Sequence, residues 1–188
     1  MHKYSPKVFC FVEKFDIKEL QTISKDIGII YRNYQKILDE KTIISIKAHC
    51  KKNSQKFYLS NNLKIAIKLK LDGLYIPSFN SMLNTKNYST HSKFTIIGSA
   101  HNEVEIKIKE KQGCRFIFLA PIFKVKKQSD YLGICRFNKL SLNKKSPLIA
   151  LGGINKDNIK KVNLLSCYGF AGISWVKKNG LNKFRPFL

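Results

Sequence analysis

The sequence predicts a single compact (β/α)8 TIM barrel, and three observations lead to that prediction. Near-continuous apolar runs are typical of parallel strands buried on both faces, and eight short ones recur here: Val8–Val12, Ile27–Tyr31, Lys56–Leu59, Gly73–Ile76, Phe94–Gly98, Arg115–Leu119, Pro147–Leu151 and Gly169–Ser174. Helical patterns separate the runs, and polar or glycine residues follow most of them. The chain has 188 residues. A barrel of this kind typically needs about 250, so we expect short helices and loops.

Three segments between the runs have helical features. The apolar residues of Leu63–Leu71 recur every fourth position, and those of Glu103–Gln112 share one stripe. Asn155–Leu165 begins with Asn155, a residue type that caps helix starts. Because the strand–helix units follow one another without a break in composition, we expect one domain over residues 1–188.

The segment Asp39–Lys52 is compatible with two structures. Thr42–Ile46 has the propensity of a strand, which would make nine strands. The apolar residues of the whole segment also fit one face of a helix, and Asp39 could cap it. We predict a helix, because this keeps the number of strands at eight.

The net charge of +23 indicates an anionic partner such as nucleic acid, a membrane surface or a phosphorylated ligand. Of the 35 basic residues only four are Arg. Surfaces that read nucleic acid favour Arg, because its planar guanidinium binds bidentately. Lys, Ile and Asn are abundant together, which fits a compositional bias of the whole proteome. We therefore expect no nucleic-acid partner.

The five cysteines are scattered and form no C-x-x-C pair, so no zinc site or redox motif is expected. No apolar stretch approaches the roughly 18 residues of a membrane span, and Met1–Pro6 is too polar for a secretory signal. We expect a cytoplasmic protein with reduced thiols and no membrane partner. A homo-oligomer is left open.

In such a barrel the residues at the carboxyl ends of the strands form the functional site. An Arg there is costly unless an anion or a carboxylate pairs with it. Arg32 is therefore either a ligand-binding residue or the partner of a structural acid such as Asp39. His101 could act as an acid or base, or it could cap and pack.

The pair Gly152-Gly153 predicts a phosphate-binding loop after the seventh strand. Glycine lets backbone N–H groups approach an anion closely, and the following helix start adds a favourable dipole. Ser174 would face the same place from the eighth strand, where phosphate sites of this architecture recur. A plain strand-to-helix turn is the alternative. Lys126 and Lys127 form either a basic lid or a solvated loop.

These residues resemble the thiamine phosphate synthase and TenI family of small TIM barrels. The matching stretches are Ile30–Arg32, Leu59–Ala66, Asp72–Ile76, Ile97–His101, Leu119–Phe123, Ile149–Ile154 and Gly169–Ser174. Family enzymes join a thiazole phosphate to an aminopyrimidine diphosphate and release pyrophosphate. The resemblance thus implies a transferase of thiamine biosynthesis with two small phosphorylated ligands.

The resemblance also implies two groups of ligand contacts. It places the thiazole phosphate against Gly152, Gly153, Ile173 and Ser174. It places the diphosphate and the reacting pyrimidine against the catalytic residues Arg32 and Ser99, with Ser60, Lys126 and Lys127 as further diphosphate contacts.

Five positions depart from the family pattern, among them Ser60, which stands where the family has an Asn, and Val125, which stands where it has a Thr. Tyr34 stands where the family has a Lys. Asn61 and Asn80 stand where it has two Mg²⁺-binding Asp residues. Amide oxygens lack the charge that holds this cation, so we expect no strong metal site and weak use of Mg²⁺ as a cofactor. Some TenI proteins tautomerise the thiazole with a His after strand six. This chain has Pro121 there, as the synthases do, which counts against that chemistry.

Four functions fit these observations, in descending order. The first is a divergent thiamine phosphate synthase-like enzyme whose Mg²⁺-diphosphate half is altered. The second is a TenI-like protein with another activity on a thiazole phosphate. The third is a non-catalytic barrel that binds a phosphorylated ligand, and the fourth is a nucleic-acid-binding protein.

Overall fold

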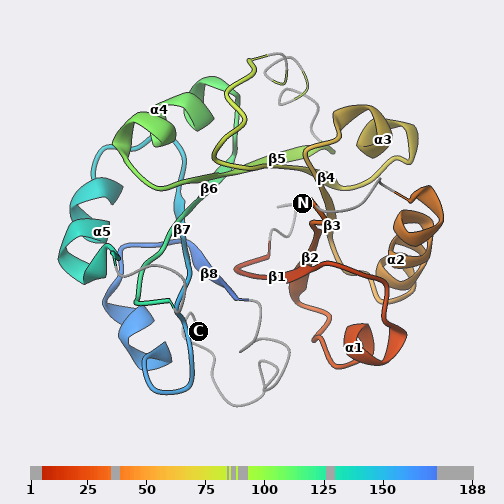
Figure 1. The fold of residues 1–188 in the computed structure, drawn as a ribbon, viewed down its shortest axis with the longest axis horizontal. Helices are drawn as coiled ribbons and strands as arrows, with labels where there is room; N and C mark the ends of the chain where they lie inside the picture. The colour runs from red at the N-terminus through yellow and green to blue at the C-terminus, as the bar shows by residue number, and fades with distance from the viewer. Residues whose placement is uncertain are drawn as a thin grey trace.

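The computed structural model describes residues 6–34, 39–83, 85, 88, 93–125 and 130–172. The eight strands pair in parallel and in chain order, and the last pairs with the first to close a barrel (Figure 1). They are β1 Val8–Val12, β2 Ile27–Tyr31, β3 Phe57–Ser60, β4 Gly73–Ile76, β5 Thr95–Ala100, β6 Phe116–Leu119, β7 Leu148–Leu151 and β8 Gly169–Gly172. The prediction of a closed eight-stranded parallel barrel is confirmed.

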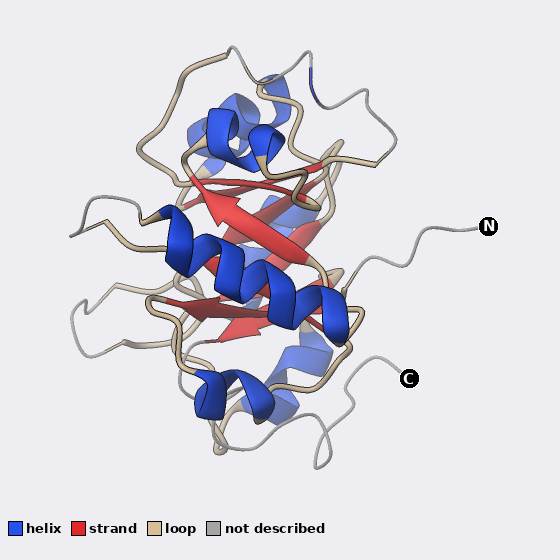
Figure 2. Ribbon diagram, turned by 90° about the vertical axis from the view of Figure 1, so that its right-hand side faces the viewer, coloured by secondary structure: helices blue, strands red, loops and turns tan. Residues whose placement is uncertain are grey.

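Helices surround the strands in the usual manner of this fold (Figures 1 and 2). They are α1 Ile17–Gln21, α2 Glu40–Lys52, α3 Leu63–Lys68, α4 Glu103–Lys111, α5 Gly133–Ser141 and the 3₁₀ helix η2 Ile159–Leu164. Most are short, as the chain length requires. None of the helices in the described ranges is long and apolar enough to span a membrane.

The helix predicted after strand two is confirmed as α2. The side chain of Asp39 accepts hydrogen bonds from the backbone N–H groups of Lys41 and Thr42, which satisfies two donors at the helix start. Ile43 and Ile46 are buried on the face that packs against the barrel. A helical face and a cap therefore outweigh the local strand propensity of this segment.

The helix predicted from Asn155 begins later than expected. The Asn155 side chain accepts hydrogen bonds from the N–H groups of Asp157 and Asn158. Asn158 in turn accepts from the Asn155 N–H and donates to the Gly153 carbonyl, at 2.8 Å each. These local bonds build a turn over residues 155–158, so that only the six residues of η2 remain for a helix.

Successive side chains along the strands point alternately into two apolar cores. One lies between the barrel and its helices, and the other fills the barrel interior with aromatic side chains. The rings of Phe9, Phe11 and Tyr75 surround that of Phe118, with centroids 5.2–5.9 Å away. These side chains fill the barrel interior, so a ligand does not bind inside it, and functional sites of this fold lie at the carboxyl ends of the strands.

Candidate functional site

Arg32 directly follows β2, at the carboxyl end of the barrel that we call the mouth. Its guanidinium carbon lies 4.7 Å from the ring centroid of Phe11 and 5.7 Å from that of Tyr34. Its ion pair is with the exposed carboxylate of Glu13, at 3.9 Å, because Asp39 caps α2 instead. Such a long, exposed pair contributes little. The Arg32 side chain is 23% exposed, and its guanidinium therefore keeps the capacity to pair with an anion.

Ser99 lies inside β5 and is buried. The Tyr75 hydroxyl donates a hydrogen bond to its Oγ, at 2.9 Å. Burial raises the pKa of Tyr75 to about 12, although interactions with Ser99 and Arg32 lower it in part. Tyr75 is consequently a neutral donor near pH 7 that links Arg32 to Ser99. The sequence did not single out Tyr75; the signal was its hydroxyl near the end of an apolar strand.

Asn61 and Asn80 meet at the mouth. The Nδ2 of Asn80 donates to the Oδ1 of Asn61 at 2.6 Å, and the Oδ1 of Asn80 accepts from the Met82 N–H at 2.9 Å. Each amide oxygen thus accepts one hydrogen bond, and neither oxygen carries a charge. Mg²⁺ prefers carboxylate and water oxygens, so these two residues do not fit it. The described residues include no group of three His, Cys, Asp or Glu that could hold a metal.

Ser60 ends β3 beneath the mouth. Its Oγ is enclosed and has no hydrogen-bond partner in the part of the chain that the structure describes. Direct contact with a diphosphate would therefore need this hydroxyl to become accessible.

Gly152 and Gly153 form a tight turn after β7, with φ of +93° and +73°. A Cβ atom on Gly153 would lie 2.4 Å from the Phe123 carbonyl oxygen and 2.7 Å from that of Lys124. A Cβ atom on Gly152 would lie 2.9 Å from the Cβ of Pro121. The loop after β6 thus presses on the turn, and this contact alone requires glycine here.

A second feature of the same turn points to an anion. Within the described ranges the backbone N–H groups of Gly153 and Ile154 donate no hydrogen bond. Neighbouring unpaired N–H groups in a turn form a concavity that binds phosphate oxygens. The predicted donors are therefore not engaged by the described residues and can donate to a ligand or, in the plain-turn alternative, to solvent. Ile173, Ser174, Lys126 and Lys127 lie outside the described residues, so their assignments stay predictions.

His101 has a structural environment. Its Nδ1 lies 2.9 Å from the Ala120 carbonyl oxygen, and its backbone N–H donates to the carboxylate of Glu105. These bonds tie the end of β5 to the end of β6 and to α4. The structure therefore shows a packing role for His101, and its acid or base role stays a prediction.

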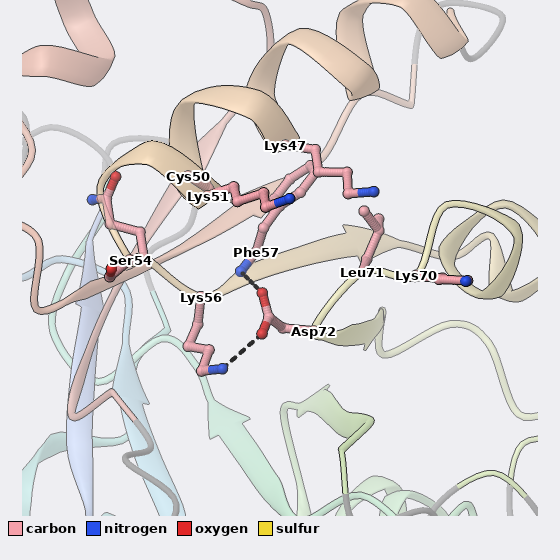
Figure 3. Close-up of a pocket in the computed structure, with 10 residues that line it drawn as sticks. Lys47, Cys50, Lys51, Ser54, Lys56, Phe57, Lys70, Leu71 and Asp72 are labelled. Atoms are coloured by element: carbon pink, nitrogen blue, oxygen red, sulfur yellow. Dashed lines mark hydrogen bonds and ion pairs between the residues drawn. The ribbon is translucent and has the colours of Figure 1, made fainter.

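A pocket of about 500 Å³ lies at the opposite end of the barrel, where β3 and β4 begin (Figure 3). The Asp72 carboxylate pairs with the Lys56 ammonium at 2.7 Å and accepts from the Phe57 N–H at 3.0 Å. These bonds join the two segments that lead into neighbouring strands. The pocket is separate from the mouth and holds none of the predicted site residues.

The sequence is similar to known synthases. Residues 28–176 match the family model described as thiamine monophosphate synthase (TMP-TENI). The chain is 39% identical over 132 residues to a thiamine-phosphate synthase of Prochlorococcus marinus, which covers 68% of this chain and 37% of that protein. It is 30% identical over 131 residues to a putative thiamine-phosphate synthase 2 of Aquifex aeolicus, which covers 69% and 70%. The chain therefore spans little more than a third of the length of two Prochlorococcus marinus synthases: 37% of the one named above and 35% of one from the subspecies pastoris.

Solved structures show the same fold. A thiamine phosphate pyrophosphorylase from Pyrococcus furiosus is 20% identical with a TM-score of 0.75, and 91% of this chain and 87% of that one are covered. A 2-keto-3-deoxy-6-phosphogluconate aldolase of Zymomonas mobilis is 14% identical with a TM-score of 0.63, covering 92% and 83%. Because one barrel hosts different reactions, these similarities establish only the architecture.

Proposed function

The chain belongs to the thiamine monophosphate synthase family, and we propose that it joins a thiazole phosphate to an aminopyrimidine diphosphate at its mouth, with release of pyrophosphate. The observation that carries the proposal is the family match over residues 28–176. This range includes Arg32 and the glycine turn, which are the two parts of the mouth to which we assign anions.

We assign the thiazole phosphate to the turn after β7. The free N–H groups of Gly153 and Ile154 are the donors, since backbone N–H groups bind phosphate without a side chain. Ile173 and Ser174 are proposed to complete this site from the end of strand eight.

We assign the diphosphate to Arg32. A guanidinium binds phosphate oxygens bidentately and stabilises the negative charge that gathers on a departing pyrophosphate. Tyr75 interacts with Arg32 and donates a hydrogen bond to Ser99, so it keeps both side chains in place. In the proposal, Ser99 lies beside the reacting pyrimidine. Lys126 and Lys127 are proposed as further donors, whereas we place the enclosed Ser60 beneath the ligand.

We further propose that the free protein binds Mg²⁺ weakly. Asn61 and Asn80 offer no carboxylate, and their amide oxygens accept hydrogen bonds from other groups. Each absent carboxylate removes an attraction of about 1 kcal/mol after solvent screening. The charge of the diphosphate is then balanced mainly by Arg32 and the lysines.

A second function is favoured by the same amide pair. If the diphosphate half is inactive, the barrel binds a thiazole phosphate and either catalyses another reaction on it, as a TenI-like protein, or binds it without catalysis. We place either function in the cytoplasm, because the five cysteines are reduced, the state that the cytoplasm maintains.

The test is turnover with both substrates, with and without Mg²⁺, measured as thiamine phosphate by chromatography. Synthesis that requires both substrates and falls at least 100-fold in Arg32→Gln supports the first function; about 3 kcal/mol of transition-state stabilisation corresponds to this loss. Calorimetric binding of thiazole phosphate without synthesis supports the second. Absence of both synthesis and binding rejects the two together.

A further inference from the structure

Two exposed aromatic rings touch each other at the mouth. Tyr34 follows β2 and Phe79 follows β4, so they come from different loops. Their ring centroids are 5.6 Å apart and their planes are inclined at 69°. The side chains are in contact although Tyr34 is 52% exposed and Phe79 is 68% exposed. Neither ring belongs to the two cores, so the fold does not explain the pair.

Polar groups flank the pair on both sides. On one side the Arg32 guanidinium carbon lies 5.7 Å from the Tyr34 centroid. On the other side Asn80, which follows Phe79 in the chain, is hydrogen-bonded to Asn61. The exposed Nδ2 of Asn61 has no partner among the described residues. A cation, two exposed aromatic rings and an amide donor thus lie near one another at the mouth.

This combination matches a planar ring that carries an anionic group. Aromatic side chains stack on heteroaromatic rings, and one such contact changes affinity by roughly ten-fold to a hundred-fold. A guanidinium pairs with phosphate, and an amide N–H can donate to a ring nitrogen. Arg32 already pairs with the anionic group, so we assign to Tyr34 a contact with the heteroaromatic ring of the ligand.

We propose that Tyr34 and Phe79 form an aromatic wall that binds the heteroaromatic ring of a phosphorylated ligand while Arg32 holds its phosphate. The inference rests on the proposed function and deepens it, because it assigns recognition of the pyrimidine ring to side chains outside the phosphate contacts. The wall makes the mouth select a ring-bearing diphosphate over diphosphate alone.

The experiment is calorimetric titration with two probes, aminopyrimidine diphosphate and inorganic pyrophosphate. We expect the unmodified protein to bind aminopyrimidine diphosphate at least ten-fold more tightly than inorganic pyrophosphate. Tyr34→Ala and Phe79→Ala each lose most of this preference, with pyrophosphate affinity unchanged within two-fold. Tyr34→Phe keeps the preference, because the ring remains. Leu142→Ala, a matched change of an exposed apolar residue at the end of α5, leaves both affinities unchanged.

Equal affinity of the unmodified protein for the two probes overturns the inference, as does a full preference in both alanine variants. A concentration-dependent dimer that Phe79→Ala dissociates also overturns it, because a second copy then covers the rings. A ring preference without synthesis of thiamine phosphate supports the wall and rejects the synthase function. Failure of both probes to bind rejects the wall and the assignment of Arg32 together.

Discussion

The glycine turn allows a matched pair of substitutions. Gly153 and Gly133 both have left-handed backbones, with φ of +73° and +67°. Alanine in this region costs about 1–2 kcal/mol at either position. Alanine also restricts the unfolded chain more than glycine does, which stabilises the folded state by about 0.4–1 kcal/mol in both variants. Gly133 differs in its surroundings, because no atom lies within 4 Å of its added Cβ. The difference between the two variants therefore isolates packing.

At Gly153 the added Cβ meets the Phe123 carbonyl oxygen at 2.4 Å, and a backbone atom cannot swing away as a side chain would. Overpacking of this kind costs a further 1–3 kcal/mol, as an order of magnitude. For a chain of this length, about 2 kcal/mol lowers the melting temperature by about 4–8 °C. We expect Gly153→Ala to melt lower than Gly133→Ala by that amount in thermal unfolding followed by circular dichroism.

Binding separates the same two variants. Relief of the clash displaces the N–H groups of Gly153 and Ile154, and a hydrogen bond to a charged group contributes about 1.5–3 kcal/mol. Thiazole phosphate affinity should fall at least ten-fold in Gly153→Ala and stay unchanged in Gly133→Ala. Gly153→Asp should abolish binding, since it adds a negative charge at the phosphate. Equal melting temperatures would refute the packing argument, and unchanged affinity in Gly153→Ala would refute the anion site.

Three further predictions concern buried charge, thiol reactivity and metal binding. Lys109 is fully buried, and its ammonium group donates a hydrogen bond to the Asn80 carbonyl at 2.6 Å. Because Lys109→Met removes this bond, amide hydrogen exchange should become faster over residues 77–83 in particular. A uniform change in exchange along the chain would contradict this. Burial raises the pKa of Cys114 to about 12, whereas Cys135 is exposed, so iodoacetamide at pH 8 should label Cys135 first by mass spectrometry. Because the fold favours the protonated Cys114 thiol, its contribution to stability is full below pH 9.0 and is lost as the pH rises toward 12. The double substitution Asn61→Asp with Asn80→Asp should raise Mg²⁺ affinity about ten-fold or more by calorimetry; tight Mg²⁺ binding by the unmodified protein would show that the amide pair is no obstacle.

The barrel could be predicted because its strands are local in the sequence. Each run of apolar residues forms one strand, and in a parallel barrel neighbours in the chain are neighbours in space. The positions of Arg32 and Gly152-Gly153 followed directly, since they end such runs. The start of η2 could not be predicted, because the side-chain bonds of Asn155 and Asn158 compete with helix formation.

The contacts within the mouth could not be read from the sequence. Tyr75 meets Ser99 through the register of β4 and β5, in which Ile76 lies opposite Gly98. Tyr34 meets Phe79 only because the loops after β2 and β4 converge. Such contacts depend on strand register and loop paths, which hydrophobic patterns do not specify.

In our proposal the two halves of the mouth bind anions by different means, and this accounts for their different degrees of departure from the family pattern. The turn after β7 uses backbone N–H groups, which any sequence supplies once Gly152 and Gly153 provide the conformation. The other half depends on side-chain identity, so Asn at position 61 and Tyr at position 34 change its chemistry directly. A chain rich in Lys and Asn can therefore keep the first half intact. In our proposal the thiazole phosphate is thus held by backbone donors, and the pyrimidine diphosphate is held by Arg32 and the aromatic wall.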